Sequence, residues 1–429
     1  MAAAGTPNRT PDTPPPQALA GVRVLELGSL IAGPYAAALL AQFGAEVIKI
    51  ESPEGGDPLR QWRKLHEGTS LWWYSQSRNK KSVTLDLRQP EGAEVARQLA
   101  ASADIVIENF RPGTLEKWGL GWEALHALNP KLIMVRVSGY GQSGPYSQRP
   151  GFAAIAECMG GLRYTSGFPD RPPVRVGVSL GDTLASLYGT IGALMALHHR
   201  NSGGSGQFID VALYESVFAI MESLVPEFSA QGFVRERSGA SLPGIAPSNT
   251  YLCGDGLYVA IAGNGDAIFR RLMNAIGRAD LADDPALAGN AGRVAQVQRI
   301  DEAIGQWTGQ HTLDQVLDVL EAAAVPAGAV MDWRYSCRWS AGCPGCTGLS
   351  PLLMSEPVCR YAWAWPPTES TTKPRMPHCS AGCAPASPAS ASCSWACMPW
   401  AAPSMPSRRP ACWRPTGACA AIPMAAKAG

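Results

Sequence analysis

One acidic side chain, Asp182, stands where it could act as a nucleophile. It follows a loop that contains Gly177 and Gly181, and the small and apolar residues after it predict a helix from Asp182 to Leu197. A carboxylate at a helix N-terminus faces unpaired backbone N–H groups and the positive end of the helix dipole. Asp182 could therefore cap the helix, which stabilises it by about 1 kcal/mol, or attack an electrophilic carbon beside backbone donors that stabilise an oxyanion. Its chemistry alone favours the cap.

Strand and helix patterns alternate along the first half of the chain. The predicted strands are Val22–Leu27, Glu46–Ile50, Ile105–Glu108, Leu132–Val137 and Gln207–Ala212, and further helices are predicted at Pro34–Phe43 and Gly92–Ala101. Alternation at this spacing implies an α/β fold with a Rossmann-like, doubly wound parallel sheet. We expect this large domain to span residues 18–219. A strand at Tyr258–Ile261 and the helices after it predict a smaller α/β domain over residues 220–329.

The first predicted strand–helix–strand unit invites a dinucleotide-binding interpretation. Glu51 lies at the end of the second strand, where dinucleotide-binding proteins of this fold have an acidic residue that binds a ribose hydroxyl. However, the turn from Gly28 to Gly33 lacks the middle glycine that lets the backbone approach a pyrophosphate, and no Lys-Ser/Thr pair follows it. A dinucleotide site is therefore disfavoured.

The composition restricts the class of protein. The chain has 429 residues, with 36 basic and 35 acidic side chains and a formal net charge of +1. The length suggests two or more domains, and the near-neutral charge gives no reason to expect a nucleic acid as partner. The apolar stretch that begins at Asp182 is short and ends in His198, His199 and Arg200, which indicates a core helix rather than a membrane span. The proline-rich residues 1–17 predict a disordered lead without a signal peptide, so we expect a cytoplasmic protein.

The amino-acid composition changes abruptly near residue 330. Ten of the twelve cysteines lie from Cys337 onward, whereas Asp, Asn, Gln and Phe are absent from Arg334 to the end. The same stretch contains nine basic side chains but only two acidic ones, Glu356 and Glu369. The cysteine pairs, such as Cys343–Cys346, could bind zinc or form disulfides. The missing residue types and the excess of positive charge favour a third interpretation, a shifted reading frame over residues 330–429, which translation of the gene in its other two frames would test.

Eight blocks of sequence agree on one family. Two of them surround Asp182: G-V-S-L-G-D-T-L-A-S-L-Y-G at 177–189 and G-G-S-G-Q-F-I-D-V-A-L-Y-E-S-V at 203–217. The others are A-G-V-R-V-L-E-L-G at 20–28, A-G-P-Y at 32–35, G-A-E-V-I-K-I-E at 44–51, N-K-K-S-V-T-L-D-L at 79–87, E-N-F-R-P-G at 108–113 and S-G-Y-G-Q-S-G-P at 138–145. Together they resemble the family III CoA-transferases, which include formyl-CoA and carnitine CoA-transferases, over roughly residues 18–330. In that family the aspartate that matches Asp182 is the nucleophile.

The resemblance also implies which residues contact CoA. The matching positions are Leu30, Ile31, Ala32, Arg88, Asn109, Phe110, Arg111, Lys117, Ser138, Gly139, Tyr140 and Gly141. The three cationic side chains among them suit the phosphates of CoA, although by residue type alone each fits a solvated surface equally well. The loop Gly263-Asn264-Gly265 resembles the glycine loop that covers the family's active site, and by itself it fits a simple turn after a strand.

The reaction that the resemblance implies is the transfer of CoA from an acyl-CoA to a carboxylic acid. It passes through an aspartyl anhydride and an aspartyl-CoA thioester, with CoA as substrate, no metal and no tightly bound cofactor. Family members form interlocked dimers, so we expect a homodimer.

Two other functions remain as alternatives. A racemase of the same superfamily has a glycine-histidine pair where this chain has Gly151-Phe152, and phenylalanine cannot transfer a proton. An inactive CoA-binding protein is the other alternative, in view of the unusual tail.

Overall fold

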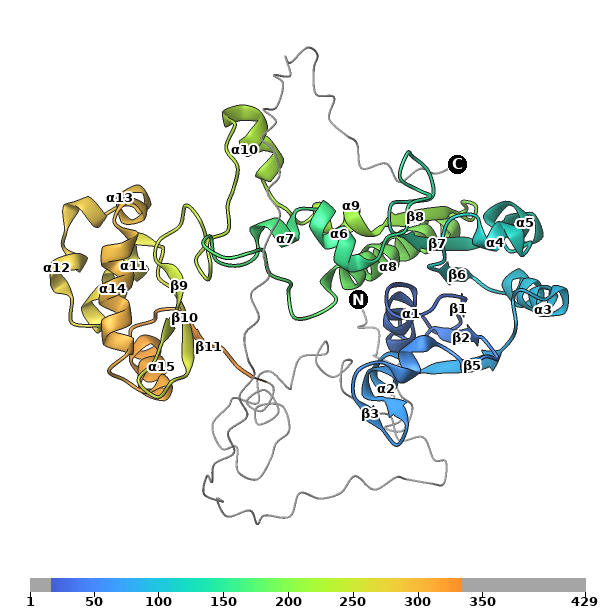
Figure 1. Cartoon of the computed structure of the whole chain (residues 1–429), viewed down its shortest axis with the longest axis horizontal. Helices are drawn as coiled ribbons and strands as arrows, with labels where there is room; N and C mark the ends of the chain where they lie inside the picture. The colour runs from blue at the N-terminus through green and yellow to red at the C-terminus, as the bar shows by residue number, and fades with distance from the viewer. Residues whose placement is uncertain (1–16, 333–429) are drawn as a thin grey trace, which may run out of the picture. The chain divides into compact units, whose positions relative to one another are not determined.

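A computed structural model describes residues 17–332 of the chain (Figure 1). The predicted lead, apart from Gln17, and the predicted tail from residue 333 onward lie outside these described residues. The paired cysteines of the tail lie outside them as well.

A six-stranded sheet in the order β5-β2-β1-β6-β7-β8 forms the centre of the first part of the chain, and every pairing in it is parallel. This confirms the predicted parallel sheet. The strands are β1 Arg23–Glu26, β2 Glu46–Glu51, β5 Lys80–Thr84, β6 Ile105–Glu108, β7 Ile133–Ser138 and β8 Phe208–Ala212. Strand β5 has no counterpart in the prediction. Its sequence, K-K-S-V-T, lacks an apolar run because it lies at the edge of the sheet and is mostly exposed.

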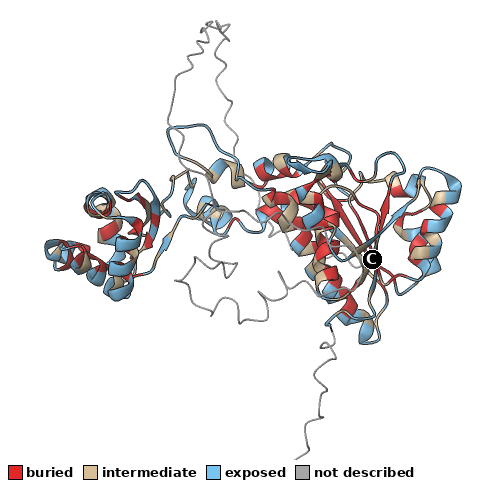
Figure 2. Cartoon of the chain, turned by 90° about the horizontal axis from the view of Figure 1, so that it is seen from below, coloured by how far each residue is buried: buried red, intermediate tan, exposed pale blue. Residues whose placement is uncertain are grey.

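Helices cover both faces of this sheet (Figures 1 and 2). Those connected to it are α1 Ala32–Gln42, α2 Leu71–Gln76, α3 Pro90–Ala101, α4 Thr114–Lys117, α5 Trp122–Leu128, α6 Ala153–Met159, α7 Leu162–Thr165, α8 Leu180–Asn201, α9 Leu213–Phe218 and α10 Leu224–Gln231, with a 3-10 turn η1 at Pro58–Gln61 and a small hairpin of β3 Leu65–His66 and β4 Thr69–Ser70. Alternate residues of each central strand enter different cores. In β6, for example, Ile105 and Ile107 join the core that contains α1 and α8, whereas Val106 joins the core that contains α3 and α5. Burial on both faces explains why the central strands are rich in apolar residues.

The strand order of the sheet changes direction between β1 and β6, which makes this position a topological switch point. Strands β2 and β5 extend the sheet on one side of β1, and β6, β7 and β8 extend it on the other. Ligands of open α/β sheets bind at the carboxyl ends of the strands where this reversal occurs. The loops after β1 and β6 are therefore the expected walls of a site.

Helix α8 begins earlier than predicted. Its N-cap residue is Ser179, and Asp182 lies within the first turn, so Asp182 does not cap this helix, although its chemistry alone favoured a cap. Within the described residues α8 is the one helix long and apolar enough to cross a membrane by length and composition alone. Its small residues pack closely on the sheet: a Cβ on Gly189 would lie 3.1 Å from Val135, and one on Gly192 would lie 3.0 Å from Ile209.

A second, antiparallel sheet in the order β11-β10-β9 follows in the chain. It consists of β9 Ser248–Leu252, β10 Tyr258–Ala262 and β11 Ala327–Ala329. The helices between β10 and β11 are α11 Asp266–Ala275, α12 Ala279–Ala282, α13 Asn290–Ala295, α14 Val297–Thr308 and α15 Leu313–Ala322, with a 3-10 turn η2 at Pro285–Leu287. These elements share a hydrophobic core of their own. The boundary at residues 219/220 stays a prediction.

Candidate active site

A cavity of about 560 Å³ lies at the carboxyl ends of β1, β6 and β7, and Asp182 is part of its wall. The residues that line it are Ser29, Leu30, Ile31, Ala32, Trp62, Asn109, Phe110, Arg111, Pro112, Val137, Ser138, Gly139, Ser147, Arg149, Gly151, Phe152, Ala153, Ala154, Arg175, Ser179, Asp182 and Leu213. Eight of the twelve predicted CoA contacts are among them. The fold thus brings segments that are far apart in the sequence to the predicted nucleophile.

A second cavity of about 360 Å³ shares two residues, Ser29 and Phe110, with the first. It contains Arg88, whose guanidinium pairs with Asp86 at 2.8 Å and with Glu54 at 3.1 Å. The Phe110 ring packs edge-on against Trp118 at 5.3 Å and forms part of both walls. Arg88 would have to exchange carboxylate partners to bind a phosphate.

The remaining predicted contacts do not line either cavity in the described part of the chain. Lys117 is exposed at the end of α4. Tyr140 packs between the rings of Tyr146 and Tyr214, at 5.8 and 5.9 Å, and Gly141 has a φ of 84° next to the Asp210 carboxylate. Their roles in CoA binding stay predictions.

Ser138 and Gly139 shape the wall at the end of β7. The Ser138 hydroxyl is buried and has no hydrogen-bond partner among residues 17–332, so it is able to bond a ligand. A Cβ on Gly139 would lie 3.0 Å from the backbone of Gly151, and only glycine allows this approach. These two residues bring the β7 loop close to the segment that leads into α6.

Asp182 is half-buried, and burial together with the charge of Glu157 raises its pKa to about 7, although Arg175 opposes the shift. Ser186, one turn further along α8, donates a hydrogen bond to the carbonyl oxygen of Ala32 at 2.7 Å. This bond ties the first part of α8 to the first residue of α1, which directly follows the loop after β1. Asp182 is therefore a basic carboxylate held against the predicted CoA loop.

Glu157 lies buried on α6 at the centre of a small charge cluster. Its carboxylate pairs with Arg163 at 3.1 Å and more loosely with Arg175 at 3.8 Å. It also accepts a hydrogen bond of 3.3 Å from the backbone N–H of Gly181. Glu157 thus positions the turn that carries Asp182 and raises the pKa of the Asp182 carboxyl.

The loop after β1 adopts an unusual backbone shape that other side chains hold in place. Leu30 has a φ of 64°, in the left-handed region that a bulky residue seldom occupies. The Asn109 amide binds both the N–H and the C=O of Ser29 at 2.9 Å, and a Cβ on Gly28 would clash with the amide oxygen of Asn109. Asn109 therefore shapes the cavity wall and has little free capacity to bond CoA.

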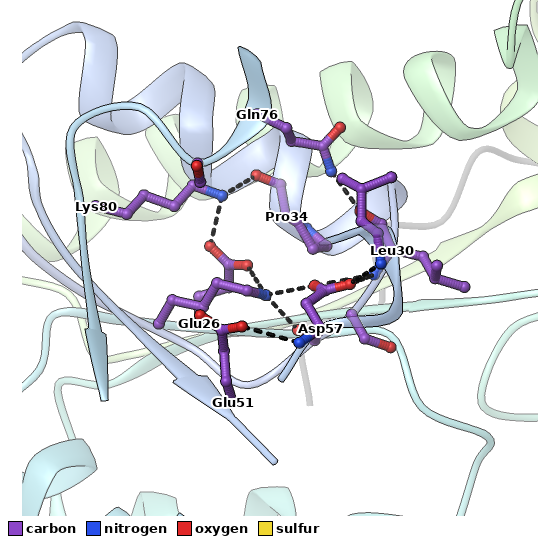
Figure 3. Close-up of polar contacts among 12 residues, drawn as sticks. Glu26, Leu30, Pro34, Glu51, Asp57, Gln76 and Lys80 are labelled. Carbon is purple, nitrogen blue, oxygen red and sulfur yellow. Dashed lines mark hydrogen bonds and ion pairs between the residues drawn. The ribbon is translucent and has the colours of Figure 1, made fainter. Parts of the chain in front are cut away.

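A buried network of charges supports the same loop from below (Figure 3). Lys49 pairs with Glu26 at 2.6 Å and with Asp57 at 2.8 Å, and it donates to the carbonyl oxygen of Gly28 at 2.9 Å. Lys80 pairs with the other oxygen of Glu26 at 2.8 Å. Asp57 accepts a hydrogen bond of 3.0 Å from the N–H of Leu30, and Gln76 donates to the Leu30 carbonyl oxygen.

The pKa values in this network follow from burial and pairing. Burial alone would raise the pKa of Glu26, but Lys49 and Lys80 lower it below its usual value. Burial would lower the pKa of Lys49, but Glu26 and Asp57 raise it, whereas for Lys80 burial outweighs Glu26 and lowers the pKa. The two acids and two amines thus compensate one another without contact with solvent.

Glu51, which a dinucleotide site would need, has other partners here. Its carboxylate accepts hydrogen bonds from Arg60 at 2.7 and 2.8 Å, from Ser82 at 2.5 Å and from the N–H of Asp57 at 2.8 Å. Burial opposes ionisation, but these donors lower its pKa to about 2. Glu51 therefore fixes the loop that presents Asp57.

This supporting network was not predicted, although the sequence contains a signal for it. Glu26 and Lys49 interrupt the apolar runs V-L-E-L and V-I-K-I of two central strands, and a charge at such a position needs a buried partner. Glu157, Arg163 and Arg175 had no comparable signal, because the first two lie on the short helices α6 and α7 and the third lies in a loop.

The predicted glycine loop also has a support that the sequence did not reveal. Arg293, on α13, is fully buried and donates to the carbonyl oxygen of Asn264 and to the Asp266 carboxylate, both at 2.7 Å. It donates as well to the carbonyl oxygens of Ala246 and Leu287. The role of Gly263-Asn264-Gly265 at the active site stays a prediction, and Arg293 fixes the shape of that loop.

Within residues 17–332 no group of three His, Cys, Asp or Glu side chains is placed to bind a metal ion. The described cysteines are Cys158 and Cys253, both free.

The buried network predicts a large effect of removing one charge. Lys49→Met should lower the free energy of unfolding by about 3–5 kcal/mol, because it leaves the Glu26 and Asp57 carboxylates without their shared partner. Urea denaturation followed by circular dichroism measures this difference.

Lys81→Met is the matched control. Lys81 lies beside Lys80 on the same strand and pairs with Glu46, but its side chain is 71% exposed. Its loss should cost no more than about 1 kcal/mol. Equal effects of the two substitutions would show that the buried network does not support the fold.

Comparison with known proteins shows the family to which the chain is related. The family described as CoA-transferase family III matches residues 19–338. The chain is 52% identical to the succinyl-CoA–D-citramalate CoA-transferase of Chloroflexus aurantiacus over 317 residues, which are 74% of this chain and 79% of that protein. It is 47% identical to the beta subunit of the succinyl-CoA–L-malate CoA-transferase of the same organism, over 73% of this chain and 78% of that subunit.

The crystal structure of a CAIB/BAIF family protein from Brucella suis has the same fold. It matches with a TM-score of 0.67 and 37% sequence identity, over 75% of this chain and 88% of that one. The protein is thus a CoA-transferase. The chain belongs to CoA-transferase family III.

Proposed function

We propose that this CoA-transferase moves CoA from a dicarboxylyl-CoA such as succinyl-CoA to a second carboxylic acid, with Asp182 as the nucleophile. The observation that carries the proposal is the position of the Asp182 carboxylate in the wall of a cavity that eight predicted CoA contacts also line. Succinyl-CoA is named as a substrate of both Chloroflexus relatives.

The proposed reaction has two symmetrical halves. The Asp182 carboxylate attacks the thioester carbonyl, and the C–S bond breaks. This step releases CoA thiolate and forms an aspartyl anhydride. The thiolate then attacks the aspartyl carbonyl, which releases the first acid and forms an aspartyl-CoA thioester. The acceptor carboxylate attacks this thioester, and CoA thiolate returns to the acceptor's carbonyl and frees Asp182. These steps use no redox group, and every atom of CoA leaves with the new product.

The surroundings of Asp182 suit this role. A carboxylate with a pKa near 7 is more basic, and so more nucleophilic, than an ordinary aspartate, and about half of it is ionised at neutral pH. The unpartnered Ser138 hydroxyl, which lines the same cavity, is a donor for a developing oxyanion. Partial burial also keeps water from competing with the second acid.

CoA is proposed to extend from Asp182 across Phe110 into the second cavity. There the Arg88 guanidinium could bind a phosphate with two parallel hydrogen bonds, once it gives up its ion pairs with Asp86 and Glu54. Arg111, which follows Phe110 in the chain, lies in the wall of the first cavity. The loop Gly263-Asn264-Gly265 is proposed to cover the site.

A homodimer is also proposed. Four apolar side chains on α8 are exposed at helical spacing, Leu187, Ile191, Leu194 and Met195. An apolar stripe of this kind on a long helix is typical of a surface that a second protein chain covers. The cytoplasmic location stays a prediction from the sequence.

Racemisation is less well supported. Phe152 lies in the cavity wall, and the charged side chains that line this cavity in the described chain are Asp182 and three arginines. Removing and returning a proton on opposite faces of a carbon needs two groups that titrate near neutral pH, and arginine does not.

The nucleophile is tested by Asp182→Ala and by the isosteric Asp182→Asn. We expect transfer to fall by at least about 10³-fold because no carboxylate remains to form the anhydride. CoA affinity, measured by calorimetry, should change little. In the unmodified enzyme, mass spectrometry after incubation with succinyl-CoA and hydroxylamine should find the modification on the peptide that contains Asp182.

Asp170→Asn is the control, because Asp170 is an exposed acid outside both cavities. It should retain full activity. An Asp182→Ala enzyme that still turns over would refute the proposed nucleophile.

The elevated pKa predicts the pH dependence. Because the carboxylate form reacts, kcat/KM should fall about tenfold per pH unit below an apparent pKa near 7. Glu157→Gln removes a negative charge that raises this pKa, so the fall of kcat/KM on the acidic side of the profile should move to lower pH.

Glu123→Gln, at an exposed position on α5, should leave the profile in place. A Glu157→Gln profile that coincides with the unmodified one would contradict the role of Glu157.

A further inference from the structure

Positive charge dominates the cavity around Asp182. Arg111, Arg149 and Arg175 line it in the described chain, and Asp182 is the one acid in its wall. CoA brings its phosphates to the distant end of such a site, so they do not explain arginines beside the nucleophile. An anionic group on the acyl portion of the substrate does.

Arg175 is the arginine best placed for that group. It lies in the segment between α7 and α8, seven residues before Asp182, and is close enough to lower the pKa of the Asp182 carboxyl. Its side chain is 48% exposed. The guanidinium therefore faces the same space as the reacting carboxylate.

The partners of Arg175 leave it available. Within residues 17–332 the carboxylate that pairs with it is Glu157, at 3.8 Å, which is too long for a hydrogen bond. Glu157 already has closer partners in Arg163, at 3.1 Å, and the Gly181 N–H, at 3.3 Å. Arg175 can turn to a second carboxylate while Glu157 stays compensated.

The other two arginines are less suitable. The Arg149 guanidinium stacks on the ring of Tyr146, 3.8 Å from its centre, and the residue is exposed. Arg111 follows Phe110, whose ring forms the wall between the two cavities, on the side proposed for CoA.

We propose that Arg175 binds the free carboxylate of a dicarboxylyl group and so selects dicarboxylyl-CoA over monocarboxylyl-CoA donors, with Glu157 as the residue that positions it. The inference rests on the proposed function, since it assumes that Asp182 attacks the thioester in this cavity. A guanidinium forms two parallel bonds to a carboxylate. A donor without that carboxylate leaves the cation unpaired, and polar sites discriminate strongly against such analogues.

The test compares two donors of equal chain length, succinyl-CoA and butyryl-CoA, which carries a methyl group in place of the free carboxylate. Single-turnover formation of enzyme-bound CoA, followed by intact-protein mass spectrometry over a range of donor concentrations, yields a second-order rate constant for each. This half-reaction requires no acceptor. We expect the unmodified enzyme to prefer succinyl-CoA.

Arg175→Gln should slow the reaction of succinyl-CoA by about 10- to 100-fold, the usual effect of losing a charged hydrogen-bond partner, and change that of butyryl-CoA by less than about threefold. Arg175→Lys, which keeps the charge without the fork, should lie between the two. Arg171→Gln, at an exposed position that lines neither cavity, is the matched control and should leave both rates unchanged.

An equal loss for both donors in Arg175→Gln would overturn the proposal, because it would show an effect on Asp182 rather than on the distal carboxylate. A loss of preference in Arg149→Gln with Arg175→Gln unaffected would also overturn it. Equal rates for succinyl-CoA and butyryl-CoA in the unmodified enzyme would overturn it too, because there would be no selection to explain. Failure of the proposed function looks different: the unmodified enzyme would then form no enzyme-bound CoA with either donor.

Discussion

Glutamates buried at the carboxyl ends of three neighbouring strands hold the loops on which the site depends. Glu26 ends β1, Glu51 ends β2 and Glu108 ends β6, and each bonds to a loop or to a cation that bonds a loop. Glu26 acts through Lys49, which also holds the Gly28 carbonyl, and Glu108 accepts the N–H of Phe110 at 2.7 Å. A buried charge tolerates few arrangements, because any shift that separates it from its partner leaves it without solvent or counter-ion. Such charges therefore fix the geometry of the cavity wall even if they add little net stability.

The same physical principle operates at Asp182 with a different outcome. Glu26 and Glu51 are compensated by cations and other donors, so their pKa values fall, whereas burial raises the pKa of Glu108 to about 7. Asp182 is only partly compensated by Arg175 and lies near Glu157, so its pKa rises as well. Glu26 and Glu51 are therefore held ionised and rigid, while Asp182 is kept basic and exposed to the cavity. The Glu157–Arg175 pair links reactivity to recognition, because the arginine that lowers the pKa of Asp182 is also the one proposed to bind the substrate.

Most of the sheet could be predicted from the sequence, because its strands are buried on both faces. Val22–Leu27 and Ile105–Glu108 are rich in apolar residues. Strand β1 lies within the first of these ranges, and β6 coincides with the second. Edge strands such as β5 and β9 escaped prediction because one side of each is solvated and its residues need not be apolar. The cap interpretation of Asp182 failed for a related reason: helix boundaries depend on backbone bonds that the residue pattern specifies only to within a turn.

Local patterns and blocks of adjacent residues are enough to predict the parallel sheet, the family and the identity of the candidate nucleophile. Which residues surround that nucleophile depends instead on how the chain packs in three dimensions. Arg175, Glu157 and Arg163 lie near it because α6 and the loop before α8 meet at the carboxyl edge of the sheet. Asn109, by contrast, turned out to hold the backbone of Ser29. Charge compensation and hydrogen bonding act through space between segments that are distant in the chain, so they follow from packing and are not written in any one stretch of sequence.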